Sequence, residues 1–182
     1  MFRRLAGASD GAQIVEFAVT LPLLVVIFVG IYDFGQAFNT KQKLANATRE
    51  GARFASNQSS NDLSMVLPPS IMAVRDVVDG YLTANNVNDC ALRTAPVTPG
   101  GSLTWVFTAT CSPGHDLTLT INRGFTYQVV SGGNTVTTEA TQVSLVYPYQ
   151  WQFSRVIQLV APGATYAGFT NIPTNTVMQN LN

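Results

Sequence analysis

The stretch GAQIVEFAVTLPLLVVIFVGIY, residues 11–32, decides how this chain must be arranged. It carries a single charged residue, Glu16, near its start, and the next charge is Asp33. The uncharged run from Phe17 to Tyr32 has further apolar residues on both sides, and with them it approaches the roughly 20 residues that a helix needs to cross a lipid bilayer. We therefore expect a transmembrane helix over about residues 14–36.

Two residues of this span are unusual for an apolar helix. A charged side chain such as Glu16 is costly inside a membrane and needs a partner or a function. The simpler explanation is an acid in the first helical turn, which the helix dipole favours. Pro22 removes one backbone hydrogen bond and is expected to bend the helix.

The helical pattern continues beyond the membrane-length span. Apolar and small residues recur at spacings of three, four and seven, which marks one face of a helix. These residues are Phe34, Phe38, Ala45, Thr48, Ala52 and Ala55. A helix from Asp10 to about Ser56 would be roughly 70 Å long, which is too long for a compact domain of this size. We expect part of it to protrude.

The rest of the chain predicts one further helix and a small sheet. The apolar positions from Ile71 to Leu82 indicate a second, shorter amphipathic helix. Alternation and β-branched residues predict three strands, at residues 103–110, 117–130 (broken near Arg123-Gly124) and 136–147. Ser-Gly-Gly-Asn at 131–134 predicts a hairpin turn. The fold class is α+β, a long N-terminal helix packed on a small head with an antiparallel sheet of three or four strands.

Several segments predict no regular structure. Residues 96–101 contain two prolines and two glycines and are expected to form a turn-rich link. Pro148 is expected to end the third strand. Residues 151–160 are short and apolar and predict either a helix or a loop. After Pro162 we expect irregular chain until a last turn near Val177.

Composition indicates where the head resides and what it does not bind. Charged residues make up 11% of the chain and the net charge is zero, against about 25% charged residues in a typical soluble protein. No basic excess favours nucleic acid. The second half has few charges and many Thr, Val, Asn, Gln and Ser residues, which is typical of an extracytoplasmic, β-rich domain.

The two cysteines, Cys90 and Cys111, fit such a compartment. An oxidised pair would add about 3 kcal/mol by the loop-entropy estimate. We expect this disulfide, and two buried free thiols are the alternative. Neither cysteine lies in a C-x-x-C motif and His115 is the single histidine, so we expect no metal site.

No motif in the sequence carries catalytic chemistry. There is no H-E-x-x-H, no G-x-S-x-G and no glycine-rich phosphate loop. We expect no catalytic residue, no cofactor and no small-molecule substrate, and therefore no enzyme.

Three elements of the N-terminal region carry a resemblance to a known family. They are Gly11 with Glu16-Phe17-Ala18 and Leu21-Pro22-Leu23-Leu24, then Gly30 with Asp33-Phe34-Gly35, then Ala47-Thr48-Arg49-Glu50-Gly51-Ala52-Arg53. In order and spacing they resemble TadE-like proteins, which are minor pilins or pseudopilins of tight-adherence (type IVc) pili. The run from Val143 to Tyr149 is similar to a family strand with a Tyr-Pro step. Asp33 stands where a Glu is common, and Thr48 where an Ala is common.

The resemblance implies a role for each matching site. A prepilin peptidase would cleave between Gly11 and Ala12, which makes Glu16 the fifth residue of the mature chain. Glu16, Phe17 and Pro22 would then take part in pilus assembly or initiation. The last matching element, with Arg49, Glu50 and Arg53, would contact the head or a neighbouring subunit.

The resemblance also implies partners and a location. The partners would be inner-membrane lipid, the prepilin peptidase, other pilin and pseudopilin subunits and the pilus assembly machinery. Residues 1–11 would be a leader peptide, residues 12–56 the long helix, and residues 57–182 an extracytoplasmic α+β head. The chain would be a single-pass inner-membrane protein that can enter an extracellular pilus.

Two other interpretations of the N-terminal region remain open. An ordinary signal peptide, cleaved after Ala37, would release a secreted β-rich binding protein. Alternatively, the apolar helix is a plain single-pass anchor for a periplasmic binding module. The signal-peptide interpretation explains Glu16 and Pro22 poorly, and it leaves the helical pattern up to Ala55 without a purpose.

Overall fold

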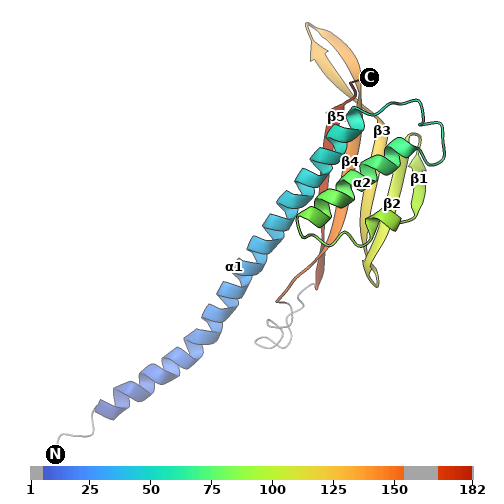
Figure 1. Ribbon diagram of the computed structural model, residues 1–182. Coiled ribbons are helices and arrows are strands. Elements are labelled where there is room, and N and C mark those ends of the chain that lie inside the picture. Colours follow the sequence, from blue (N-terminus) through green and yellow to red (C-terminus); the bar gives the residue numbers. More distant parts are fainter. Residues whose placement is uncertain (1–5, 154–167, 182) are drawn as a thin grey trace, which may run out of the picture. The chain divides into compact units, whose positions relative to one another are not determined.

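The structure, a computed structural model, describes residues 6–153 and 168–181 (Figure 1). It divides into two compact units. The first comprises the chain up to Phe38 together with Gln150–Gly168, and the second comprises Asn39–Tyr149 and Phe169–Asn182. Helix α1, Ala6–Ser56, runs through both units. It ends at the residue where the spacing of small side chains predicts its end.

The second unit contains a five-stranded sheet whose strands lie in chain order. The strands are β1 (Val97–Gly101), β2 (Thr104–Ser112), β3 (His115–Ser131), β4 (Asn134–Gln150) and β5 (Phe169–Gln179). Antiparallel pairs join β1 to β2, β2 to β3 and β3 to β4. The α+β class predicted from the sequence is therefore confirmed, and the sheet has one strand more than expected.

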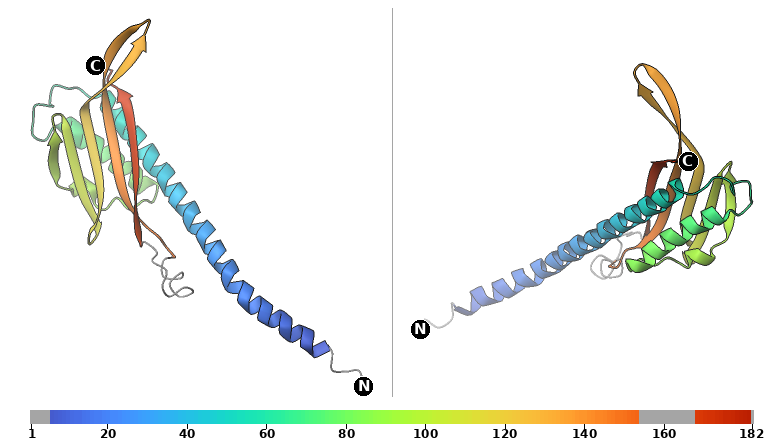
Figure 2. Two further views of the ribbon diagram at one scale, coloured as in Figure 1. Left: turned by 180° about the vertical axis from the view of Figure 1, so that it is seen from behind. Right: turned by 45° about the horizontal axis from the view of Figure 1, so that its top comes forward.

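The two helices lie on one face of this sheet. Helix α2, Pro69–Ala84, and residues 39–56 of α1 cover the same side, as the two views of Figure 2 show. A short 3₁₀ helix, Leu92–Thr94, follows α2. Fully buried side chains from all these layers form the core: Leu44, Ile71, Val74, Val78, Leu82, Phe107, Leu117, Leu119, Ile121, Val143 and Leu145. Burial alternates along β2, because neighbouring side chains of a strand point to opposite faces.

The turn between β3 and β4 is the one that the sequence predicts. Ser131 pairs with Asn134, which leaves two residues in the turn. Gly132 and Gly133 have φ values of 59° and 82°. Glycine adopts this left-handed conformation without a steric penalty, and a two-residue hairpin turn with two positive φ angles requires it.

Two strands lie where the sequence predicts irregular structure. Strand β1 occupies the expected turn-rich link, and β5 replaces the expected single turn near Val177. Both are edge strands, and each contains a proline, Pro99 or Pro173. An edge strand tolerates a residue without an N–H because one side of it needs no ladder bond. Ile172 and Met178 of β5 pack against the core.

Pro148 also does not end its strand, since β4 continues to Gln150. The pairing of β4 with β3 stops at Val146, opposite Thr118. A proline just beyond this point interrupts no hydrogen bond to β3. Of the segment 151–160, residues 151–153 leave β4 in a turn, and the rest lies outside the described residues.

The disulfide predicted from the sequence is present. Cys90, in the chain after α2, is joined to Cys111 of β2, with 4.7 Å between their Cα atoms. The bond closes a loop with a sequence separation of 21 residues. By the loop-entropy model, it stabilises the fold by about 3 kcal/mol.

A row of small residues allows α1 to lie close to α2. Ala47, Gly51, Ala52 and Ala55 are all buried. A Cβ atom added to Gly51 would lie 2.6 Å from the Cγ2 atom of Val78 on α2. Such a distance is far inside van der Waals contact, so this position accepts only glycine unless the helices move apart.

We expect Gly51→Ala to destabilise the second unit by about 1–3 kcal/mol, because an added methyl group overpacks this contact. The measurement is chemical unfolding of the full chain with Trp151→Phe in detergent, followed by the fluorescence of the remaining, buried Trp105. Gly80→Ala is the matched control, since a Cβ there meets nothing within 4 Å. It should raise stability by about 0.4–1 kcal/mol through helix formation. Equal effects of the two changes would contradict the packing described.

A β-bulge directs one arginine to the end of α1. The pairing of β3 with β4 shifts between Asn122 and Phe125, where the sequence predicts a break. Arg123, in this bulge, is only 5% exposed. Its Nη1 donates to the carbonyl of Ala55, and its Nη2 donates to the carbonyl of Gln58 at 2.9 Å.

This contact adds a charged donor at the C-terminal end of the helix, where the Ala55 carbonyl also accepts the N–H of Gln58 at 3.0 Å. A cation at this end also interacts favourably with the helix dipole. Burial lowers the pKa of Arg123 overall, although the nearby charge of Asp62 opposes this shift. The guanidinium remains charged at any physiological pH. Arg123 therefore fastens the C-terminal end of α1 to the sheet.

Arg123→Met is expected to lower the free energy of unfolding by about 1–3 kcal/mol, because the carbonyls of Ala55 and Gln58 each lose a charged hydrogen-bond donor. The control is Arg53→Met, which removes an exposed arginine from the last turn of α1. That change should cost less than about 1 kcal/mol, the usual size of a dipole effect at the surface. Denaturant titration of both variants and the parent chain decides the matter. A loss at Arg53 as large as that at Arg123 would speak against the cap.

Candidate functional site

The N-terminal part of α1 presents apolar side chains that the described chain leaves exposed. In the described residues one helix is long and apolar enough to cross a membrane, and it is this one. The most apolar window of α1 contains no buried residue. The large exposed side chains are Ile14, Val15, Phe17, Val19, Leu21, Leu23, Leu24, Val25, Ile27, Phe28, Ile31, Tyr32, Phe34 and Phe38. Apolar surface on this scale indicates contact with lipid or with other helices.

The predicted processing and assembly residues all lie on this exposed helix. Gly11 and Ala12 are exposed, and a Cβ added to Gly11 would meet nothing within 4 Å. Glu16 is exposed next to Phe17, whose exposure is 61%. Pro22 lies inside α1, which continues through it. Glu16 therefore presents a carboxylate on an apolar surface.

Asp33 is a buried acidic residue of this region whose carboxylate accepts hydrogen bonds from the chain itself. Its side chain is 1% exposed. One carboxylate oxygen accepts the backbone N–H of Gln152 at 3.2 Å, and the other accepts that of Phe153 at 3.4 Å. These donors give both oxygens of the buried carboxylate a hydrogen-bond partner. They also join α1 to the turn that follows β4, within the first unit.

Sequence reasoning places Asp33 at the edge of the span and assigns it no partner. The partners lie 119 and 120 residues further along the chain, and both are backbone groups. The sequence does contain one sign that Asp33 needs a partner. Asp33 comes directly after an uncharged apolar stretch, where a charge requires compensation.

The charged residues near the end of α1 point away from the head. Arg49, Glu50 and Arg53 are all exposed, whereas their neighbours Thr48 and Ala52 are buried. The hydroxyl of Thr48 hydrogen-bonds that of Thr176 in β5 at 3.0 Å. Small buried residues thus make the contact with the head. The three charged side chains form an exposed surface, which leaves a neighbouring subunit as their proposed contact.

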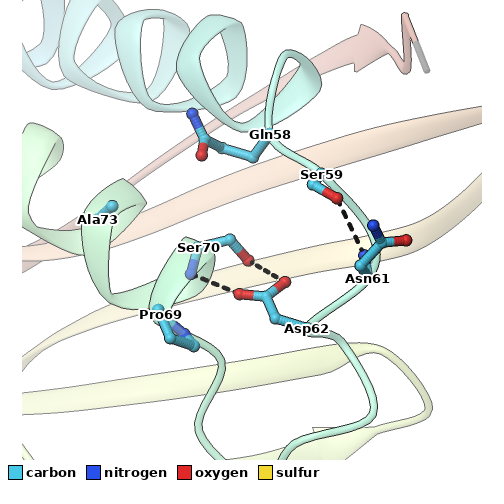
Figure 3. A pocket seen from close by; sticks show the side chains of 7 residues that line it. All are labelled: Gln58, Ser59, Asn61, Asp62, Pro69, Ser70 and Ala73. Carbon is cyan, nitrogen blue, oxygen red and sulfur yellow. Dashed lines mark hydrogen bonds between the residues drawn. The ribbon is translucent and has the colours of Figure 1, made fainter.

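A hollow beside the start of α2 is a structural feature rather than a ligand site (Figure 3). One carboxylate oxygen of Asp62 accepts the backbone N–H of Ser70 at 2.8 Å, and the other accepts its hydroxyl at 2.9 Å. Desolvation raises the pKa of Asp62, but the hydrogen bonds from Ser70 and the charge of Arg123 outweigh it and lower the pKa overall. Asp62 therefore caps α2. Among the described residues, no cluster of His, Cys, Asp or Glu suits a metal ion.

These observations define a membrane-helix protein with an α+β head, whose apolar N-terminal helix continues into the head. Residues 11–53 match the family model of the TadE-like proteins, and the resemblance predicted from the sequence is confirmed for this stretch. The match indicates a protein associated with tight-adherence pili that has an N-terminal membrane helix. No curated protein and no solved structure matches the chain significantly.

Proposed function

We propose that this chain is a pilin-like subunit that takes part in the assembly or initiation of a tight-adherence pilus. A prepilin peptidase cleaves it between Gly11 and Ala12. The mature chain then resides in the inner membrane, with its head outside the cytoplasm, until the assembly machinery extracts it. Its role is structural, and it needs neither a cofactor nor a small-molecule substrate.

The observation that carries this proposal is the exposed Glu16 on an uncovered apolar helix. A carboxylate inside an apolar layer is stable only when a partner neutralises it. Cleavage before Ala12 creates an α-amino group four residues from Glu16, on the same chain and on every neighbouring copy. A salt bridge to this group would set the register in which subunits stack.

The exposed apolar surface of α1 supports the same assembly step. In the membrane, lipid covers these side chains. In a filament, apolar side chains of other subunits would replace the lipid, so that extraction exposes little apolar surface to water. Phe17 and its apolar neighbours on α1 would form this contact, and the bend expected at Pro22 would shape it.

The exposed charges at the other end of the helix suit contacts between heads. Arg49, Glu50 and Arg53 carry both signs on one helix surface. Complementary charges on a neighbouring pilin or pseudopilin would fix orientation more than they add affinity.

The structure weighs against release by an ordinary signal peptidase. Cleavage after Ala37 would cut α1 in the middle of an unbroken helix and would remove Asp33, which holds the turn after β4. It would also split the stretch that matches the family. A membrane-retained chain explains both features.

Glu16→Ala is expected to abolish most pilus assembly while the head stays folded and the chain stays in the membrane. The reason is that the α-amino group of a neighbour loses its carboxylate partner. The measurement is the amount of pili sheared from cells, alongside membrane fractionation of the subunit. Glu139→Ala, an exposed carboxylate on the head, is the matched control and should assemble normally. Normal piliation with Glu16→Ala would count heavily against the proposal.

A further inference from the structure

Four aromatic side chains gather around the Asp33 contact, and we call them the aromatic collar. Tyr32 packs edge-on against Phe153, with 5.6 Å between ring centroids and 80° between ring planes. Phe34 packs against Trp151 in the same manner, at 5.4 Å and 68°. Edge-to-face contacts of this kind are favourable beyond the area that they bury. The collar thus unites α1 with the turn after β4, and all four residues belong to the first unit.

The position of the collar along α1 corresponds to the thickness of a bilayer. Tyr32 lies 18 residues after Ile14, which is about 27 Å along a helix. The hydrocarbon core of a bilayer is about 30 Å thick. If the apolar span starts at one surface of the core, the collar lies at the other.

The chemistry of the collar suits this layer. Trp and Tyr are enriched at membrane–water interfaces because their rings are apolar and each carries one polar group. Tyr32 and Phe34 are 55% and 57% exposed, and Trp151 and Phe153 are half-buried. The collar therefore has apolar ring surface available for lipid.

Asp33 makes the collar compatible with an apolar surrounding. A backbone N–H that reaches lipid must find a partner within the protein. The Asp33 carboxylate supplies that partner to Gln152 and Phe153 and is itself shielded, since it is 1% exposed. Both carboxylate oxygens and both N–H groups thus have hydrogen-bond partners next to lipid.

We propose that the aromatic collar binds the interfacial layer of the lipid bilayer, and that Asp33 is the positioning residue that holds it in shape. The proposal rests on the membrane location of α1 in the proposed function and adds a second membrane contact, at the end of β4. The contact fixes how deeply the chain sits in the membrane. It must be released when the subunit is extracted.

Single-tryptophan variants test the depth of the collar directly. The chain has two tryptophans, so Trp105→Phe leaves Trp151 as the reporter. Trp151→Phe leaves Trp105, which is 6% exposed in the core, as the matched control. Each full-length variant is reconstituted into phosphatidylcholine vesicles with bromine near the carbonyl end or near the middle of the acyl chains. Flotation of the vesicles shows whether the protein is in the membrane.

We expect shallow bromine to lower Trp151 emission about two-fold and deep bromine to lower it less, because an interfacial tryptophan lies near the carbonyl end of the acyl chains. Trp105 emission should change little with either lipid. If the chain floats but Trp151 responds no more than Trp105, the lipid contact of the collar is contradicted, while the membrane location of α1 is not. A second protein copy that covers the collar would give this result. Stronger quenching by deep bromine would also overturn the proposal. A chain that does not float would contradict the proposed function as well.

Asp33→Ala tests the positioning role in the Trp105→Phe background. Loss of the two backbone contacts should reduce the preference of Trp151 for shallow over deep quenching, while the chain still floats. Asp116→Ala, an exposed aspartate on β3, serves as the control and should leave the preference unchanged. An unchanged preference with Asp33→Ala would overturn the role of Asp33.

Discussion

The apolar surface of α1 between Ile14 and Phe38 needs a cover other than water, and the rest of the account depends on this requirement. Burying apolar area yields about 25 cal/mol for each Å², and in the described residues this surface is not covered by the chain itself. Lipid and other helices are the two environments that can cover it. In the proposed function, lipid covers this surface while the subunit is in the membrane, and helices of other subunits cover it in the filament.

The proposed move of α1 from lipid to other helices requires that the helix remain attached to its head. The structure achieves this with close packing at Gly51 and with the cap that Arg123 forms on the last turn of α1. Both contacts lie within the second unit and do not depend on the membrane. Asp33 forms the corresponding attachment in the first unit, where it joins α1 to the turn after β4.

Sequence reasoning succeeds here where the signal is local. The end of α1 and the course of α2 follow from helical spacing, the β3–β4 turn follows from two glycines, and the disulfide follows from the presence of two cysteines in the chain. The edge strands β1 and β5 are not predicted. Proline and glycine in β1, and the many Asn and Thr residues in β5, are typical of loops, whereas pairing with the neighbouring strand determines the conformation of both. The roles of Asp33 and Arg123 are not predicted either. Their partners are backbone groups 65 or more residues away, which no sequence pattern marks.

The most direct test of the account is the N-terminus of the protein recovered from cells, determined by intact mass and by the N-terminal peptide. Processing at the predicted bond gives a mature chain that begins at Ala12, with Glu16 as its fifth residue. A chain that begins at Phe38 would contradict the account and indicate a secreted head domain. A chain that keeps Met1 would contradict the processing step and indicate a plain membrane anchor.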